Sequence, residues 1–184
     1  MKPTAISRLF ILVLLSALTL WCQLSGQSQS TSNPSAQPQG SHMIRNQKYQ
    51  LMLRPRDASR KDGTPIVLYA YQPWKCMGWR FEPQPGGARL VNYFTGKTFE
   101  AQTQSGSDAP LIQMPATPET AARQSWNFVS IGGGLYKIEL PAGGLVLTAI
   151  DPEGNGDIQV ILSPWKGSDA QKWQLVDLPE RFTM

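Results

Sequence analysis

Histidine is nearly missing from this 184-residue chain, and its one copy, His42, lies in a polar segment with the composition of a linker. The folded part of the chain is therefore expected to contain no imidazole. Histidine-based catalytic triads, histidine-ligated zinc and histidine general bases are excluded for that reason. The sequence also has no glycine-rich phosphate loop ahead of a helix. We predict no enzyme activity, no metal and no cofactor.

One acidic stretch resembles a calcium-binding loop, because it carries an oxygen-bearing side chain at every second position: Asp151, Glu153, Asn155 and Asp157. Alternate oxygens can face one cation, but the bidentate glutamate that ends such a loop is missing. We favour a plain acidic turn.

Cysteine is scarce as well, with Cys22 near the end of an N-terminal apolar stretch and Cys76 further along. If the N-terminal stretch is removed, one thiol remains and no disulfide framework is possible. Cys76 is expected to be a small, half-buried apolar residue. Without a neighbouring histidine it is a poor candidate for a nucleophile.

Long apolar runs are missing too, since the N-terminal one covers only residues 9–21 and is too short to cross a membrane comfortably. Lys2 and Arg8 precede most of it, which is typical of a secretory signal, placed here at residues 1–26. We expect a secreted or periplasmic protein without a transmembrane domain.

Two alternatives for the leader stay open. A lipid anchor on Cys22 is less favoured, because the bulky Trp21 stands where a small residue should precede the cysteine. The leader is alternatively retained as an N-terminal anchor.

Residues 27–43 are polar and contain no Lys, Arg, Asp or Glu, so they cannot bury enough apolar surface to order themselves. We interpret them as a flexible tether. A domain at residues 44–178 and a tail at residues 179–184 follow. Residues 40–43, Gly-Ser-His-Met, also resemble a cloning scar, and in that case the leader and the domain are not contiguous in nature.

Charge is close to balanced once the leader is set aside, so the net charge of +4 overstates how basic the domain is. This balance gives no reason to expect nucleic acid as a partner. Residues 44–97 contain ten basic and three acidic side chains, whereas residues 98–184 contain five basic and ten acidic ones. Two interpretations remain: an unevenly charged solvated surface, or a basic face on the first repeat that meets an anionic glycan or membrane surface.

Short strand-like runs separated by glycine-containing turns fill the domain, and no segment of 12 residues has a convincing helical period. One helix-like piece covers residues 118–124. We predict an all-β chain of about 11–12 strands, of which the clearest cover residues 49–53, 66–71, 79–82, 89–94, 97–101, 111–114, 126–131, 135–140, 145–150, 159–162 and 173–176.

The domain is organised around three tryptophans separated each time by 47 residues: Trp79, Trp126 and Trp173. Equal spacing indicates an internal repeat. Gln124 and Gln171 begin Gln-x-Trp motifs, and Met77 takes the glutamine's place in the first unit. A unit of four short strands cannot bury its own face, but three units around one axis can. The three tryptophans are therefore expected in the core.

These features resemble the ricin-B-type β-trefoil lectin family over residues 44–178, on the two Gln-x-Trp motifs, the degenerate third and the 47-residue period. The resemblance implies a β-trefoil with three repeats and about 12 strands. It also implies sugar binding, in which an aspartate begins each site, an aromatic ring stacks on the sugar and Asn or Gln donors complete it. We expect a monomer.

The matching positions depart from the family pattern in every repeat. The aspartate falls near Met52 or Leu53, on Glu100 and on Thr148. The stacking aromatic falls on Tyr69, Met114 and Leu162. The asparagine before the motif is replaced by Cys76, Arg123 and Ala170. With nearby substitutes, the carbohydrate-binding candidates are Tyr69, Trp74, Glu100, Gln113, Gln124, Asp157, Trp165 and Gln171.

Each candidate also has a structural interpretation. Gln124 and Gln171 are expected to bond neighbouring backbone, and Tyr69 to pack along its strand. Trp74 and Trp165 belong to recurring Pro-Trp-Lys loops. They either cap the barrel or stand exposed for a ligand.

Two functions follow from this sequence. The first is a carbohydrate-binding module with degenerate sites, whose partner is a carbohydrate or glycoconjugate. The second is a β-trefoil protein-interaction or inhibitory module without lectin activity. Exposure of Tyr69, Trp74 and Trp165 would favour the first, and burial of all three with an exposed patch elsewhere would favour the second.

Overall fold

Twelve β-strands and four short 3-10 helices make up the part of the chain that the computed structural model describes, residues 37–103, 107–156 and 158–183. The predicted signal peptide, Cys22 and most of the predicted tether lie outside these residues. Within them, no helix has the length and apolar character needed to span a bilayer. The longest helix, η3 (Pro118–Gln124), coincides with the one helix-like segment of the sequence.

Six strands close into a barrel, because each pairs antiparallel with two others of the set. They are β1 (Ser41–Asn46), β4 (Trp79–Gln84), β5 (Gly87–Asn92), β8 (Ser125–Gly132), β9 (Leu135–Glu139) and β12 (Trp173–Asp177). The pairing runs from β1 to β4, β5, β8, β9 and β12 in turn and returns to β1. Closure leaves none of these six described strands with a free edge.

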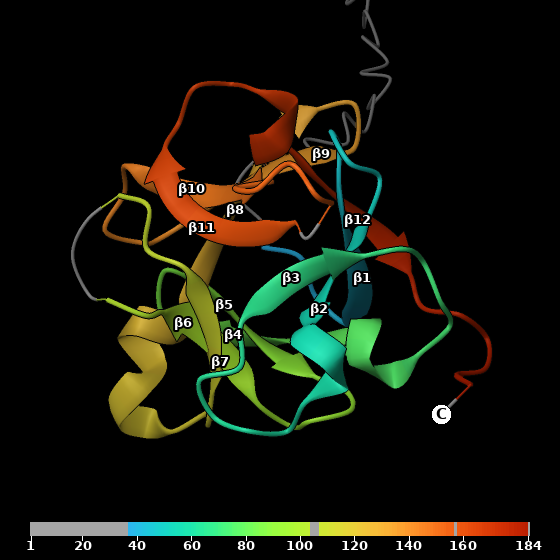
Figure 1. Ribbon diagram of the computed structural model, residues 1–184. Helices are drawn as coiled ribbons and strands as arrows, with labels where there is room; N and C mark the ends of the chain where they lie inside the picture. Colours follow the sequence, from blue (N-terminus) through green and yellow to red (C-terminus); the bar gives the residue numbers. More distant parts are fainter. Residues whose placement is uncertain (1–36, 104–106, 157, 184) are drawn as a thin grey trace, which may run out of the picture. The chain divides into compact units, whose positions relative to one another are not determined.

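The other six strands form three hairpins: β2 (Met52–Pro55) with β3 (Ile66–Tyr69), β6 (Thr98–Ala101) with β7 (Leu111–Met114), and β10 (Leu145–Ile150) with β11 (Gln159–Pro164). The hairpins also pair with one another in a ring. β3 pairs with β11, and single bridges join Pro65, just before β3, to β7 and Pro110, just before β7, to β11. Figure 1 shows β11 beside β3, and η3 beside β6. The unit of barrel strand, hairpin and barrel strand occurs three times. The predicted β-trefoil is therefore confirmed.

The folded region begins before residue 44. β1 starts at Ser41, inside the segment predicted to be a tether, and Met43 is fully buried opposite Val176 of β12. Gln37 also contacts the barrel, because its Oε1 accepts a hydrogen bond from the Phe128 backbone nitrogen at 2.8 Å. The strand escaped prediction because Met43 and Ile44 are its only aliphatic residues.

The C-terminal residues pack on the same domain. The Phe182 ring lies 5.8 Å from that of Tyr93, and the Thr183 nitrogen donates to the Pro73 carbonyl at 2.7 Å. Phe182 also packs against a small buried cluster of Met43, Met52, Cys76 and Met77. The predicted tail is thus tied to the loop that follows β3.

The three repeat tryptophans are fully buried in the main core, as predicted. Phe99 joins two of them, with its ring centroid 5.3 Å from Trp79 and 5.0 Å from Trp126. Trp79 and Trp173 each donate an indole N–H to a backbone carbonyl at 3.0 Å, whereas the Trp126 Nε1 has no hydrogen-bond partner among the described residues. The three-fold arrangement is therefore imperfect at its centre.

Close approach of two barrel strands requires glycine at position 87. A Cβ atom there would lie 2.2 Å from the Trp126 carbonyl oxygen, which is backbone and cannot move aside. Gly87 thus lets β5 come near β8, next to the pair formed by Ala88 and Trp126.

We expect the exchange Trp173→Phe to destabilise the domain more than Trp126→Phe, by about 1 kcal/mol. Both exchanges remove the same part of a fully buried ring, but only Trp173 loses a hydrogen bond, whose net contribution is about 1 kcal/mol. Urea unfolding followed by far-UV circular dichroism measures the difference. Equal losses would contradict the role assigned to the indole N–H.

Candidate functional site

Indole hydrogen bonds align the first and third hairpins. The acceptor for Trp79 is the Leu53 carbonyl, and the acceptor for Trp173 is the Leu147 carbonyl. Leu53 and Leu147 are therefore equivalent, and so are the residues that follow them, Arg54 and Thr148.

The second hairpin is aligned by its glutamine. Gln124 donates to the Glu100 carboxylate at 2.8 Å, as Gln171 donates to the Thr148 hydroxyl at 3.2 Å. We call Arg54, Glu100 and Thr148 the acid position, since the family aspartate was expected there. The expectation of Met52 or Leu53 in the first repeat was wrong. The second repeat has one extra residue between this position and its tryptophan, so a strict 47-residue step misses it.

The two motif glutamines are buried and tie each hairpin to the loop that follows it. Gln171 accepts from the Lys166 nitrogen at 2.7 Å and donates to the Pro164 carbonyl at 2.8 Å. Gln124 donates to the Pro115 carbonyl at 3.0 Å. Because these amides already have partners within the protein, their structural interpretation is supported.

Met77 replaces this tie in the first repeat. Its sulfur accepts from the Gln72 backbone nitrogen at 3.3 Å. This bond is equivalent to the one between Lys166 and Gln171 in the third repeat, because both of its residues lie two repeat lengths earlier in the chain. A glutamine at position 77 would need an acceptor for its amide N–H at the acid position. Arg54 has only donors there. Arginine at position 54 therefore explains why position 77 holds a methionine, which has no N–H to donate, in place of a glutamine.

In the second repeat the carboxylate at the acid position already has partners within the protein. One oxygen of Glu100 lies 3.0 Å from Arg123 Nε, and the other accepts from Gln124. Met114 stands at the aromatic position and offers no ring. This repeat closes its acid position with an ion pair of its own.

Gln113 faces away from Glu100, because neighbouring residues of a strand point to opposite sides. It pairs with Phe99 in the hairpin, and its side chain donates to the Ser59 and Lys61 carbonyls, each at 3.0 Å. The structure therefore does not bring Gln113 together with the other candidates of the second repeat. Instead it holds the loop between β2 and β3, in the first repeat.

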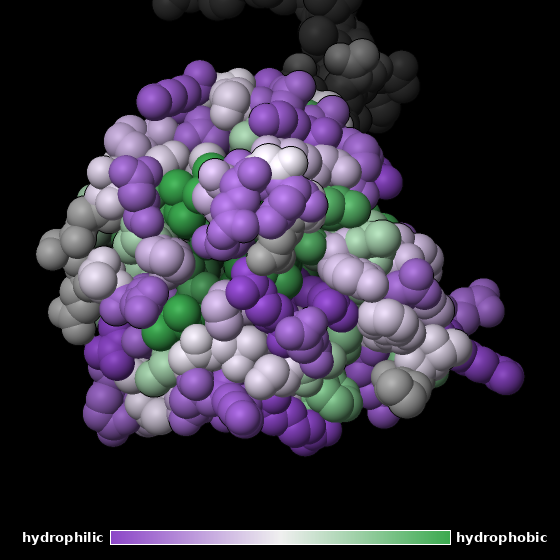
Figure 2. Space-filling view, viewed as in Figure 1, coloured by the Kyte–Doolittle hydropathy of each residue, from purple (hydrophilic) through white to green (hydrophobic). Residues whose placement is uncertain are grey.

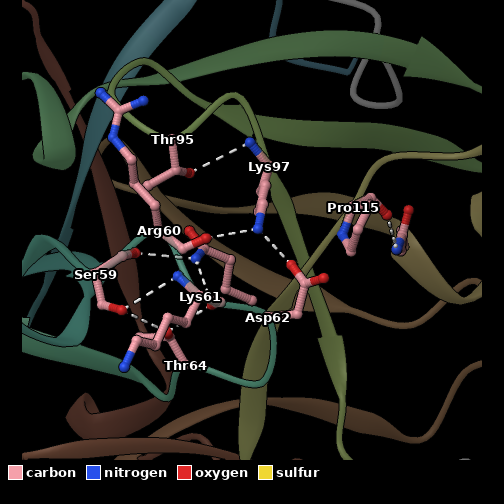
Figure 3. Close-up of polar contacts among 10 residues, drawn as sticks. Ser59, Arg60, Lys61, Asp62, Thr64, Thr95, Lys97 and Pro115 are labelled. Carbon is pink, nitrogen blue, oxygen red and sulfur yellow. Dashed lines mark hydrogen bonds and ion pairs between the residues drawn. The ribbon is translucent and has the colours of Figure 1, made fainter.

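Lys97 holds the same loop from the second repeat, as Figure 3 shows. Its ammonium donates to the Arg60 carbonyl at 2.6 Å and to the Asp62 carboxylate. The Arg60 guanidinium lies 4.2 Å above the Phe94 ring. The first repeat's hairpin loop is thus anchored on the turn between β5 and β6.

In the third repeat Ser163, rather than Leu162, occupies the aromatic position, because Ser163 pairs with Val146 as Tyr69 pairs with Met52. Leu162 is buried in the core. The Ser163 hydroxyl also accepts from Gln171 at 3.1 Å. The third repeat therefore forms a closed polar cluster without an aromatic ring.

Trp165 is 38% exposed, and Lys137 Nζ lies 5.8 Å from its ring. The Pro-Trp-Lys recurrence is out of phase with the repeat, since Trp165 is equivalent to the exposed Tyr71 and not to Trp74. Asp157 lies outside the described residues. Among those described, no group of three or more potential metal ligands is found.

The first repeat carries an open pocket of ≈ 340 Å³ between β2, β3 and the loop before β4. Tyr69 is 42% exposed, and its ring is nearly parallel to that of Trp74, with 6.1 Å between the centroids. The Arg54 guanidinium lies 3.9 Å from the Tyr69 centroid and 5.8 Å from the Trp74 centroid. The pocket is lined by Arg54, Asp57, Ala58, Tyr69, Trp74, Cys76 and Phe94.

Two residues of its rim have unusual backbone conformations. Asp57 and Ala58 have φ values of 53° and 52°, in the left-handed region that non-glycine residues seldom adopt. Such strain persists where the surroundings hold it. Here Gln113 and Lys97 hold the adjoining residues 59–62.

Cys76 lies at the inner end of this pocket and is buried. Burial raises the pKa of its thiol, and the Arg54 guanidinium partly opposes the shift. The neutral thiol is therefore favoured, as expected for a packing residue rather than a nucleophile.

Of the residues that line this pocket, Tyr69 and Trp74 were candidates from the sequence, whereas Arg54 and Phe94 were not. The excess of basic residues over 44–97 was the available signal for Arg54. No signal distinguished Phe94. Two structural asparagines were also missed. Asn46 donates to the Ala170 carbonyl at 3.0 Å, and Asn92 donates to the Cys76 carbonyl at 2.8 Å. Each acceptor lies three residues before a repeat tryptophan.

A protein-family model described as ricin-type beta-trefoil lectin domain-like matches residues 122–184. No curated protein sequence matches the chain. Solved structures do. A designed 3-fold symmetric protein, ThreeFoil, is 27% identical with a TM-score of 0.69, covering 76% of this chain and 99% of its own.

Two natural proteins share the fold at lower identity. The ricin B-like lectin of Macrolepiota procera, solved with lactose, is 17% identical with a TM-score of 0.63, covering 77% of this chain and 99% of its own. An exo-beta-1,3-galactanase from Clostridium thermocellum is 24% identical with a TM-score of 0.67, covering 77% of this chain but 31% of its own. The resemblance to ricin-B-type β-trefoil lectins is thus confirmed, by sequence over the last third and by fold over the domain.

The exchange Met77→Gln is expected to destabilise the domain by about 1–2 kcal/mol. The N–H groups of the new amide would face Arg54, which has no acceptor for them. Combining it with Arg54→Thr should recover at least about 1 kcal/mol, since threonine supplies the acceptor seen at Thr148. Urea unfolding of the four members of this double-mutant cycle measures the coupling. The control Gln171→Met should lose stability regardless of position 54. Additive effects at positions 54 and 77 would refute the pairing.

Cys76 should react with iodoacetamide at pH 8 at least about tenfold more slowly in the native protein than in urea, because burial both shields the thiol and disfavours its thiolate. Mass mapping of the Cys76 peptide follows the reaction separately from Cys22. Labelling at the same rate in both states would mean that the pocket's inner end is open.

Proposed function

We propose that this protein is a non-catalytic carbohydrate-binding module that binds its ligand through the first repeat. The observation that carries the proposal is the pocket that Arg54 lines together with Tyr69, Trp74 and Phe94. It lies at the hairpin position where the lectin resemblance implies a sugar site. The other two repeats retain the fold of such a site without its free groups.

The chemistry of the pocket suits a pyranose ring. A pyranose has an apolar face, which an aromatic ring can cover, and an edge of hydroxyls, which charged and polar groups can bond. Tyr69 and Trp74 supply the rings, and Arg54 and Asp57 supply the polar groups. Its volume of ≈ 340 Å³ lies at the lower end of the roughly 300–1,000 Å³ typical of ligand pockets.

The second and third repeats support a single-site module. Glu100 is paired with Arg123 and Gln124, and Thr148 is bonded to Gln171. A sugar hydroxyl would have to displace these bonds to reach either group. Trp165 is exposed, but the acid position of its repeat, Thr148, is already bonded to Gln171, so Trp165 contributes at most a secondary contact.

The solved neighbours agree with this direction. The Macrolepiota procera lectin is solved with lactose, and an earthworm R-type lectin of the same fold, with a TM-score of 0.57, is solved with GalNAc. We extend sugar binding to this chain as part of the proposal. We also propose that the module works outside the cytoplasm, which rests on the predicted signal peptide at residues 1–26.

A protein-interaction role is the second candidate. Tyr71 and Tyr93 are 50% and 41% exposed and do not line the pocket. Figure 2 shows, in contrast, a largely hydrophilic face in which apolar residues are recessed between polar ones. The absence of a broad apolar patch on that face favours the sugar-binding module.

A glycan array should show binding by the chain, and the exchange Tyr69→Ala should weaken it by about 5–20-fold through loss of a stacking ring, an effect on the order of 1–2 kcal/mol. Tyr71→Ala is the matched control, because that tyrosine follows the same strand outside the pocket. It should change binding less than about twofold. Silence across neutral and acidic glycans would remove the sugar-binding proposal.

A further inference from the structure

Arg54 is the one acid-position residue whose charge is not neutralised by a neighbour. Its side chain is only 6% exposed, and among the described residues it forms no ion pair with a carboxylate. Its Nε has no hydrogen-bond partner there either. By contrast, Glu100 at the equivalent place has Arg123.

A buried guanidinium without a carboxylate partner is unfavourable, because it has lost water and, at Nε, retains an unused donor. The rings of Tyr69 and Trp74 compensate in part through cation–π contacts at 3.9 Å and 5.8 Å. These contacts stabilise the charge but accept none of its in-plane N–H groups. An anion in the pocket would accept them in the bidentate geometry that arginine favours.

The surroundings add to the positive charge. Arg54 lines a second recess of ≈ 440 Å³ beside the pocket, together with Arg56. Arg60 lies over Phe94, which lines the pocket. Asp57 borders both recesses and is the acidic residue that opposes these groups. The basic excess of residues 44–97 thus has a local focus here.

We propose that the first-repeat pocket selects a negatively charged sugar, a pyranose with a carboxylate or sulfate group that Arg54 binds. The ring would lie against Tyr69 and Trp74, and the charged substituent would reach the guanidinium. Arginine replaces the family aspartate, so the acid position has changed from a hydrogen-bond acceptor to a donor. This inference rests on the proposed function, because it names the class of sugar for the same site.

Isothermal titration calorimetry on the full chain tests the proposal with three probes: methyl galactoside, methyl galacturonide and inorganic sulfate. The galacturonide should bind at least about tenfold more tightly than the neutral galactoside, and added salt should reduce this preference. Galactose 6-sulfate in place of the galacturonide distinguishes sulfate from carboxylate as the charged group.

The variant Arg54→Gln should abolish the preference for the acidic sugar, and it should also weaken the binding of the neutral sugar, because Arg54 supplies a polar group to the pocket. Arg54→Lys should retain part of the preference, because lysine keeps the charge but not the planar donors. Arg80→Gln is the matched control, since Arg80 is exposed on β4 and paired with Glu82 at 2.6 Å. Circular dichroism and urea unfolding confirm that each variant is folded.

Three results would overturn the inference, and they are distinguishable. Equal binding of neutral and acidic sugars, unchanged in Arg54→Gln, would refute the charge selection and leave the proposed function standing. Sulfate alone binding as tightly as the galacturonide would show an anion site without sugar recognition. Binding of no sugar at all would refute both this inference and the proposed function.

Discussion

The hydrogen bond from a buried indole to a hairpin carbonyl is the contact on which the rest of the domain depends. Trp79 and Trp173 each join the start of a barrel strand to the first strand of a hairpin. In the first and third repeats this bond sets how the hairpin lies on the barrel, and so it decides which residue occupies the acid position. Trp126 occupies the same place without such a bond, and there Phe99 fills the contact by ring packing.

From this contact the three repeats diverge in chemistry while keeping one backbone plan. In the third repeat a threonine, a serine and a glutamine close on one another, and in the second a glutamate is neutralised by an arginine. In the first repeat the acid position holds Arg54, and Met77 stands in place of the motif glutamine. A glutamine there would point a second hydrogen-bond donor at the guanidinium. In this repeat, aromatic rings and an unneutralised charge border an open pocket. Under the proposed function, the loss of the family pattern in the first repeat is a change of ligand preference.

The architecture was predictable because a large buried residue recurs at a fixed interval, and three phased tryptophans determine a closed barrel with three hairpins. The site was less predictable because equal tryptophan spacing hides compensating length changes inside the repeats. One extra residue in the second repeat separated the expected acid position of the first repeat, Leu53, from the observed one, Arg54. The third repeat's aromatic position lies two full periods after Tyr69, at Ser163, so the expected Leu162 was off by one residue. Gln113 lies in the second repeat, as expected, but it does not join that repeat's other candidates for another reason. Its side chain crosses to a neighbouring loop, and pairing between repeats leaves no trace in the spacing within one.

The central claim is that the first repeat binds ligand while the tryptophans that build the trefoil do not take part. The indole N–H signals in a ¹⁵N-correlated NMR spectrum, recorded during titration with methyl galacturonide, test it most directly. The signal of Trp74 is predicted to shift progressively, while those of Trp79, Trp126, Trp165 and Trp173 stay in place. Movement of Trp165 with a stationary Trp74 would contradict the claim and place the ligand on the third repeat.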